Sequence, residues 1–330
     1  MHVPRPASIR AMRFLQVTEL DGRYVAVLAE TERPVPREAE VLVRVAASGV
    51  NRADLMQIAG RYPPPPGEPD IIGLELSGTT EGTGEAVCAL VAGGGHAEYV
   101  AAPAGQVFPA PAGLDLVAAA GIPEAFLTAF LSLVVEAGLT RGATLLVHAG
   151  ASGVGLAAIQ LGKLIGARVA ATTRTSEKLP ALEAAGADLA IDAGRHDFVE
   201  RIEGRWGRDA VDVVLDPIGA PSLSGDVRVL ATGGRVVVIA TMAGARAEVD
   251  LALLMRKRAR LVGTMLRARS RAEKAPIVAR FTREILPHFT SGALRVPVDG
   301  VFPAHRAADA FQRMRENRNT GKILIAWPRD

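Results

Sequence analysis

From about residue 123 the chain alternates short apolar runs with stretches of helical periodicity, and this alternation constrains the fold most. Strands that are covered on both faces need near-continuous Val, Ile and Leu, and regular alternation with helices makes such strands parallel. The pattern predicts an α/β fold with a doubly wound parallel sheet. Six apolar runs carry it: ATLLVHA, ARVAA, DLAIDA, AVDVVLD, RVVVIAT and ARLVGTML.

The chain before residue 123 has a different sequence pattern. Residues 12–101 read as short alternating segments separated by Gly, Pro and Asp-Gly turns, which is typical of an antiparallel, barrel-like sheet. The tail combines two helical stretches with two strands, and we expect it to pack back on this first part. The 330 residues therefore predict two domains, one from residues 1–122 with 270–330 and the other from residues 123–269.

Composition narrows the class of protein. The 38 Lys and Arg against 35 Asp and Glu are spread without a dense basic block, which argues against a nucleic-acid partner. The single cysteine, Cys88, leaves no internal disulfide and too few thiolates for a zinc lobe. No charge-free apolar run reaches the roughly 18 residues of a membrane span, and the N-terminal MHVPRPASIR has no apolar signal core. We expect a cytoplasmic protein without a membrane partner.

The first run of the alternating region leads into a glycine-rich turn and then an amphipathic helix. Small residues at a strand-to-helix turn let the backbone approach a pyrophosphate, and the helix start attracts its charge. A tight turn that needs glycine only for packing is the alternative. A Ser152 nucleophile is disfavoured because Val154 stands where a nucleophile elbow needs glycine, and no Gly-Lys-Ser/Thr follows. The predicted cofactor residues here are Gly150, Ala151, Ser152, Gly153, Val154 and Gly155.

The second run ends in the sequence TTRTSEKL. An NAD enzyme places Asp or Glu at this strand end to bind the ribose 2′-hydroxyl, whereas Thr173, Arg174 and Lys178 stand here. Cations and hydroxyls suit a 2′-phosphate, and charge-assisted hydrogen bonds of about 1.5 to 3 kcal/mol each would favour it. The stretch predicts NADPH as the cofactor. The alternative is that Arg174 and Lys178 are solvated residues at a helix start.

Six further stretches point to a known family: SGVNRADLMQIAGRYPPPPG, GGGHAEYV, IPEAFLTAF, HAGASGVGLAAIQLGK, LPHF and NRNTGKI. Together they resemble the zinc-free medium-chain dehydrogenase/reductases, and within them the zeta-crystallin-like quinone oxidoreductases. The similarity covers nearly the whole chain from Met12 and looks closest to the p53-inducible quinone oxidoreductase subgroup. It implies a GroES-like, mostly-β catalytic domain, a Rossmann domain and a homodimer paired near GTMLRA.

The resemblance also implies roles for single residues. Asn51 and Tyr62 would line the cleft near nicotinamide and substrate, with Tyr62 donating to a carbonyl oxygen, and Thr128 resembles a residue that meets the nicotinamide ribose or amide. The alternatives are a Tyr packed on the prolines and a Thr back-bonded to its helix. Asn319 and Lys322 match a tail segment that reaches the cofactor. Residues at the later strand ends, where open α/β sheets bind ligands, are Ile218, Gly219, Thr241, Met242, Met265, Leu266 and Arg267.

Three departures from relatives bear on these roles. Zinc members of the superfamily carry Cys at the position of Asn51 and Gly-His-Glu at Gly73-Leu74-Glu75, so no metal site is expected. The segment LSGTTEGTGEAVCAL is about ten residues shorter than the family's usual hairpin. Ala193 stands where the subgroup has a Tyr that contacts the 2′-phosphate, which leaves the phosphate to Arg174 and Lys178.

The function expected from these features is NADPH-dependent reduction of a quinone without metal. An NADPH-dependent enone or enoyl-thioester reductase, with Tyr62 as the proton donor, is the alternative on the same scaffold. A non-catalytic nucleotide-binding protein of the crystallin type is the further alternative. In the first two cases the partner is a small molecule, either a quinone or an activated alkene.

Overall fold

The computed structural model describes residues 11–20 and 22–328, and the chain forms two compact units. Unit 1 comprises residues 1–124 and 267–330, and unit 2 comprises residues 125–266. The expectation about MHVPRPASIR lies outside the described residues. Within the described ranges, no helix is both long and apolar enough to cross a membrane.

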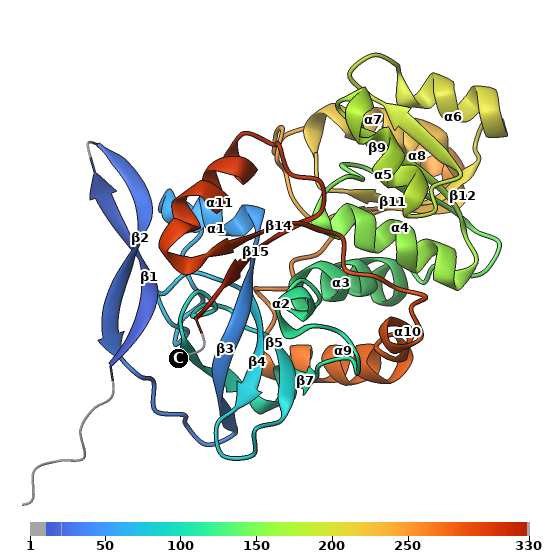
Figure 1. Ribbon diagram of the computed structural model, residues 1–330. Coiled ribbons are helices and arrows are strands. Elements are labelled where there is room, and N and C mark those ends of the chain that lie inside the picture. The colour runs from blue at the N-terminus through green and yellow to red at the C-terminus, as the bar shows by residue number, and fades with distance from the viewer. Residues whose placement is uncertain (1–10, 21, 329–330) are drawn as a thin grey trace, which may run out of the picture. The chain divides into compact units, whose positions relative to one another are not determined.

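Unit 2 is built on a six-stranded parallel sheet, as the alternation predicts (Figure 1). The strand order is β10-β9-β8-β11-β12-β13, so the order reverses between β8 and β11, where open α/β sheets bind ligands. Strand residues such as Leu146, Val214 and Val236 are fully buried, which explains the near-continuous apolar runs. The strands are β8 (Thr144–Val147), β9 (Arg168–Thr173), β10 (Leu189–Asp192), β11 (Val211–Asp216), β12 (Leu230–Val238) and β13 (Arg260–Gly263).

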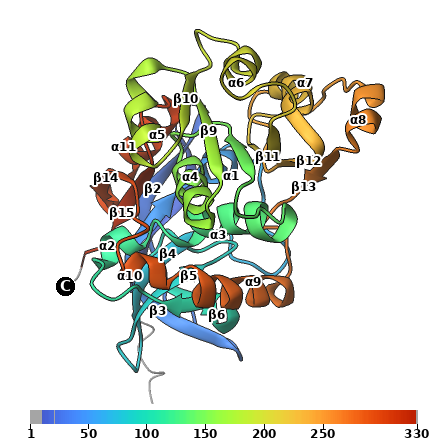
Figure 2. The ribbon, with the colours of Figure 1, turned by 90° about the vertical axis from the view of Figure 1, so that its right-hand side faces the viewer.

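Helices follow the strands of unit 2, and α4 and α5 lie against β8, β9 and β10 (Figure 2). Gly166 ends α4 in the left-handed conformation with φ of 90°, which glycine adopts without strain. The helices are α3 (Pro123–Phe130), which starts in unit 1, the π-helix η2 (Leu131–Glu136), α4 (Gly153–Ile165), the 3₁₀ turn η3 (Ser176–Lys178), α5 (Leu179–Ala184), α6 (Phe198–Trp206), α7 (Ala220–Val229) and α8 (Leu251–Lys257).

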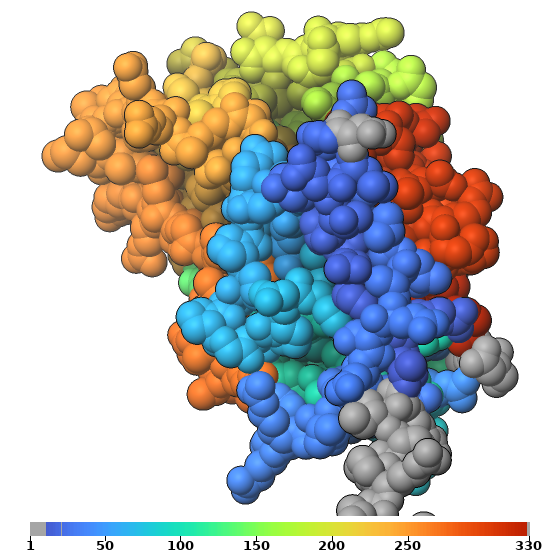
Figure 3. Space-filling model, turned by 90° about the vertical axis from the view of Figure 1, so that its left-hand side faces the viewer, coloured from blue at the N-terminus to red at the C-terminus, as the bar shows by residue number. Residues whose placement is uncertain are grey.

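Unit 1 contains a two-stranded hairpin and a seven-stranded sheet. The tail strand β15 pairs antiparallel with β3, from Ile323 opposite Val50 to Ala326 opposite Ala47, so residues far apart in sequence share one sheet (Figure 1). The hairpin lies beside the tail (Figure 3). The strands are β1 (Ala11–Leu20), β2 (Arg23–Glu32), β3 (Glu40–Val50), β4 (Glu75–Thr80), β5 (Ala86–Leu90), β6 (Tyr99–Pro103), β7 (Val107–Pro109), β14 (Val298–Pro303) and β15 (Lys322–Ala326).

Short helices connect the strands of unit 1. The stretch after Asn51 forms a helix that the sequence pattern did not predict, and Asn51 N donates to Asp54 Oδ2 at 2.7 Å where this helix begins. The helices are α1 (Arg52–Ile58), η1 (Ala104–Gln106), α2 (Leu116–Ala119), α9 (Arg271–Glu284), α10 (Pro287–Thr290), η4 (Ala304–Arg306) and α11 (Ala307–Arg315).

Candidate functional site

The glycine turn lies at the carboxyl end of β8 and is packed too closely for larger residues. A Cβ on Gly155 would lie 2.5 Å from Ala149 O, and one on Gly150 would lie 3.0 Å from the Ala171 Cβ. Ser152 caps α4, because its hydroxyl accepts from Gly155 N at 3.0 Å. The residues present therefore fit a dinucleotide pyrophosphate, which needs close backbone approach and the start of a helix.

Replacing Gly155 with Ala should raise the dissociation constant for NADPH at least tenfold. The added Cβ can be accommodated only if the turn moves, because its neighbours are backbone atoms. Gly204→Ala is the matched control, since a Cβ on Gly204 in α6 meets nothing within 4 Å. Isothermal titration of both variants with NADPH checks this, and equal affinity in the two would show that the turn does not hold the cofactor.

The buried side chain of His148 connects the elements next to the glycine turn. His148 Nε2 lies 2.7 Å from Asp226 Oδ1, and His148 Nδ1 lies 2.9 Å from the Thr172 hydroxyl. Burial lowers the pKa of His148, but the charge and hydrogen bond of Asp226 outweigh it and the net pKa is raised. The imidazole thus joins the ends of β8 and β9 to α7. Sequence reasoning did not assign His148, because its partner Asp226 lies 78 residues away.

The end of β9 carries the predicted 2′-phosphate residues. Thr173 is buried, Arg174 is exposed and Lys178 is half-buried. The sequence did not lead us to assign Asp192, which ends β10 opposite Thr173 and accepts from the Ser176 hydroxyl at 2.5 Å. The Ser176 hydroxyl is therefore already engaged. Arg195 Nε lies 3.7 Å from Asp192 Oδ2 and adds a cation to this edge of unit 2.

The ends of β11, β12 and β13 are ordered mainly by backbone contacts. Asp216 accepts from the backbone N–H of Ile218 at 2.6 Å and of Gly219 at 3.1 Å, so it caps this turn. Met242 N donates to Pro217 O at 3.2 Å, which ties the segment after β12 to the same turn. The remaining predicted residues differ in exposure: Thr241, Met242 and Met265 are exposed and Leu266 is buried.

Unit 1 contains a buried polar cluster around Glu75. Lys322 Nζ donates to Asn51 Oδ1 at 2.8 Å, to Val50 O at 3.2 Å and to Glu75. Asn51 Nδ2 donates to Glu75 Oε1 at 2.9 Å, so the amide is fixed at both ends. Because an ammonium has three donors, Lys322 has none left over. Lys322 thus holds Asn51 in this structure, and its contact with the cofactor stays a prediction. Asn319 donates to Gly321 O at 2.9 Å.

A second chain of hydrogen bonds runs from Asn51 to the tail. Asp54 Oδ2, which accepts from Asn51 N, lies 3.3 Å from His96 Nε2, and His96 Nδ1 lies 2.8 Å from Ser48 Oγ. Trp327 Nε1 donates to the same hydroxyl at 3.1 Å. The order Asp, His, Ser is that of a hydrolase triad, but all three side chains are fully buried. These contacts position Asn51 and keep the Ser48 hydroxyl away from any substrate.

Across residues 11–20 and 22–328, no three His, Cys, Asp or Glu side chains gather as metal ligands do.

Tyr62 is fixed by Arg267. The Arg267 guanidinium lies 4.5 Å from the centre of the Tyr62 ring, and its Nη1 donates to Tyr62 O at 3.1 Å. Arg267 Nε donates to Ala92 O at 2.9 Å, so the predicted cofactor residue Arg267 also serves to hold Tyr62. Its remaining nitrogen, Nη2, is buried without a hydrogen-bond partner in the part of the chain that the structure describes.

Thr128 is half-buried in α3, in unit 2. Its carbonyl accepts from the Ser132 hydroxyl at 2.7 Å, whereas no hydrogen bond from the Thr128 hydroxyl itself is seen among the described residues. The back-bonded alternative is therefore not what the structure shows. The hydroxyl remains available to a ligand, and its contact with nicotinamide stays a prediction.

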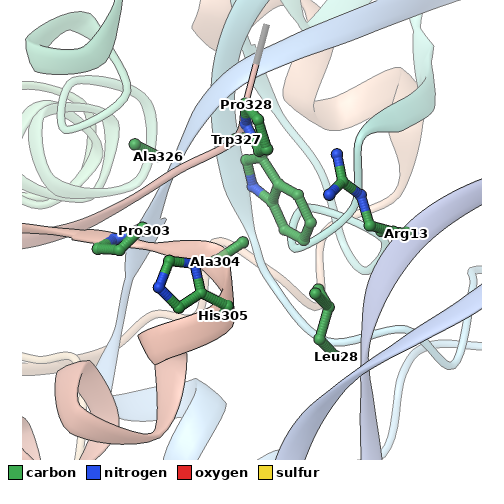
Figure 4. A pocket seen from close by; sticks show the side chains of 8 residues that line it. All are labelled: Arg13, Leu28, Pro303, Ala304, His305, Ala326, Trp327 and Pro328. Carbon is green, nitrogen blue, oxygen red and sulfur yellow. The ribbon is translucent and has the colours of Figure 1, made fainter. Parts of the chain in front are cut away.

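A separate cavity of about 270 Å³ lies in unit 1 beside Trp327 (Figure 4). Arg13 and His305 are its charged or titratable lining residues, and Arg13 Nε donates to Glu98 Oε1 at 2.8 Å. Neither Asn51 nor Tyr62 lines it. This cavity therefore gives no support for an acceptor site at the predicted residues.

Two family models match the chain. The alcohol dehydrogenase GroES-like domain matches residues 37–112, and the zinc-binding dehydrogenase domain matches residues 153–282. The quinone oxidoreductase of Lama guanicoe is 28% identical over 96% of this chain and 98% of its own length. The quinone oxidoreductase of Thermus thermophilus, solved also as a complex with NADPH, is 32% identical over 96% of this chain and 100% of its own, with a TM-score of 0.83. A phenolphthiocerol/phthiocerol polyketide synthase polypeptide of Mycobacterium tuberculosis is 32% identical over 98% of this chain, but over 15% of its own length.

The fold, the glycine turn and these matches define a nicotinamide-dependent oxidoreductase with a GroES-like domain and a Rossmann domain. The chain belongs to the zinc-free, quinone-oxidoreductase-like family of medium-chain dehydrogenases/reductases.

Proposed function

We propose that the protein is an NADPH-dependent quinone reductase that works without metal. The observation that carries the proposal is similarity along the whole length of two quinone oxidoreductases, at 98% and 100% of their chains. The residues that bind zinc in other members are replaced by Asn51 and Leu74. A quinone needs no Lewis acid, because the incoming charge delocalises onto its carbonyl oxygens.

Each unit has a distinct task in this proposal. In unit 2 the turn from Gly150 to Gly155 holds the pyrophosphate, and Arg174 and Lys178 hold the 2′-phosphate. In unit 1 the Tyr62 hydroxyl, whose ring is held by Arg267, donates to an acceptor carbonyl, and Asn51 is kept in one orientation by Lys322 and Glu75. The bound nicotinamide supplies the hydride, so positioning by these residues provides most of the rate acceleration.

Reduction of an activated double bond is the second candidate. A polyketide synthase polypeptide contains a stretch that is 32% identical to this chain, the same identity as that of the Thermus thermophilus quinone oxidoreductase. In this case Tyr62 polarises the carbonyl of an enone or enoyl thioester. Steady-state turnover of NADPH with 1,2-naphthoquinone, a simple enone and crotonyl-CoA separates the candidates. Faster turnover of either alkene than of the quinone would favour the second, and binding of NADPH without any turnover would favour a non-catalytic protein.

We also propose a homodimer formed along β13 and a cytoplasmic location. β13 is an edge strand of the unit 2 sheet, and an unpaired strand edge is a ready site for pairing with a second chain. Leu261 on this strand is 40% exposed, and Met255 in the preceding helix is 76% exposed, which supplies apolar surface for such a contact.

A further inference from the structure

We propose that Glu124 donates the proton that completes reduction of the acceptor. This inference rests on the proposed reductase function and adds a catalytic residue to it. The sequence alone indicates no role for Glu124, which lies in the stretch IPEAFLTAF and is the last residue of the first segment of unit 1.

The backbone places Glu124 at the polar cluster of unit 1. Glu124 is the second residue of α3, and its N–H donates to Glu75 Oε2 at 2.8 Å. The other carboxylate oxygen of Glu75 accepts from Asn51 Nδ2 and from Lys322. The start of α3 is thus attached to the same carboxylate that orients Asn51. The Glu124 side chain therefore starts beside this cluster.

The Glu124 carboxyl is half-buried and unpaired. It makes no hydrogen bond or ion pair within the described ranges of the chain. The two nearby ammonium groups are engaged elsewhere: Lys322 donates to Glu75, Asn51 and Val50, and Lys274 Nζ donates to Arg267 O at 2.9 Å. A partly buried carboxyl that lacks a cation or a donor is more stable with its proton on.

The charges around Glu124 favour the protonated form as well. The pKa of Glu124 is raised from 4.5 to about 8, mainly by burial and then by the Glu75 carboxylate and Asp54, while Lys322 and Lys274 oppose the rise. These groups come from β4, α1, β15 and α9, the elements that bring charge to this position. The carboxyl therefore holds its proton at neutral pH and can still release it, as a general acid must.

Tyr62 is less suited to give up a proton. Burial raises the pKa of its hydroxyl above the ordinary 10, Glu124 raises it as well, and Arg267 opposes this. A hydroxyl that keeps its proton can donate a hydrogen bond to the acceptor carbonyl throughout the reaction. Tyr62 thus orients the acceptor carbonyl by a hydrogen bond, and Glu124 donates the proton.

A hydride, two electrons with one proton, passes from dihydronicotinamide to the quinone and leaves a hydroquinone monoanion. The O–H bond of Glu124 then breaks, a new O–H bond forms on the hydroquinone oxygen, and water returns a proton to the Glu124 carboxylate. For an enone the new bond is a C–H bond at the α-carbon, where a positioned acid matters more because carbon is protonated slowly.

The test compares Glu124→Gln, Glu124→Asp and the control Glu38→Gln, which removes an exposed carboxyl of unit 1. We expect the parent's kcat/KM with 1,2-naphthoquinone to fall as the pH rises through about 8. In Glu124→Gln, kcat/KM at pH 7 should be at least tenfold lower than in the parent and should not fall further as the pH rises through about 8. The affinity of this variant for NADPH should stay unchanged. Glu124→Asp should recover part of the rate. A Glu124→Gln variant with the parent's rate and pH profile would overturn the assignment alone, whereas a parent inactive with every acceptor would overturn the proposed function as well.

A second readout does not depend on activity. Because the folded-state pKa lies above the unfolded value, the stability contributed by the protonated carboxyl is present below about 4.5 and is lost as the pH rises to about 8. Gln stays neutral throughout, so Glu124→Gln should match the parent's unfolding midpoint near pH 5 and exceed it increasingly toward pH 8. A difference in unfolding midpoint between Glu124→Gln and the parent that does not change with pH would contradict a protonated Glu124.

Discussion

Replacing Lys322 with Met is expected to lower the free energy of unfolding by about 3 to 5 kcal/mol and to abolish turnover. The substitution leaves Glu75, which is fully buried, without the cation that pairs with it, and it removes the donor that holds Asn51 Oδ1. An uncompensated charge in an apolar interior is far more costly than the pair is stabilising. Urea denaturation of parent and variant measures the change.

Two further variants make this prediction sharper. Lys163→Met removes an ammonium whose pair with Asp188 is 36% and 39% exposed, so it should cost less than about 1 kcal/mol. The double variant Glu75→Gln with Lys322→Met removes both charges and should recover much of the stability lost in Lys322→Met, because such pairs are not additive. A single Lys322→Met variant as stable as Lys163→Met would show that the cluster does not organise unit 1.

The double variant Arg174→Ala, Lys178→Ala is expected to weaken NADPH binding by about 100-fold or more and to leave NADH binding nearly unchanged. Each charge-assisted hydrogen bond to the 2′-phosphate contributes about 1.5 to 3 kcal/mol, and NADH lacks that phosphate. Both dissociation constants are to be measured at one fixed ionic strength.

The matched control for this pair is Arg205→Ala, Arg208→Ala, which removes two exposed cations of unit 2 at α6 and the turn after it. It changes the net charge by the same amount, so a general electrostatic effect would appear in both double variants. If Arg174→Ala, Lys178→Ala kept the parent's ratio of NADPH to NADH affinity, the TTRTSEKL stretch would not select the cofactor.

Local sequence pattern was enough to predict the sheet of unit 2. Strands such as β8 and β11 are buried on both faces, which forces continuous apolar runs, and the helices between them repeat at regular intervals. The glycine turn could also be predicted from local pattern. Gly155 has to be glycine because backbone atoms lie where a side chain would stand. The helix α1 was missed, since its seven residues carry too little periodicity.

The contacts within the candidate site were beyond reach of local pattern. Lys322 and Glu75 are 247 residues apart and meet because β15 and β4 both pair with β3, and His148 and Asp226 meet across 78 residues. Motif resemblance placed Asn51 and Lys322 near a site without showing that one holds the other. The proposed role of Glu124 could not be inferred from the sequence, because the raised pKa of its carboxyl depends on burial, Glu75 and Asp54, which no stretch of sequence displays.

Single-turnover mixing of the NADPH-loaded protein with 1,2-naphthoquinone, beside a simple enone and crotonyl-CoA, tests the central claim most directly. We expect nicotinamide absorbance to be lost fastest with the quinone, in a metal-chelated sample as in an untreated one, and far more slowly when NADH replaces NADPH. Loss that is no faster with the quinone than with the enone, or that needs added metal, would contradict it.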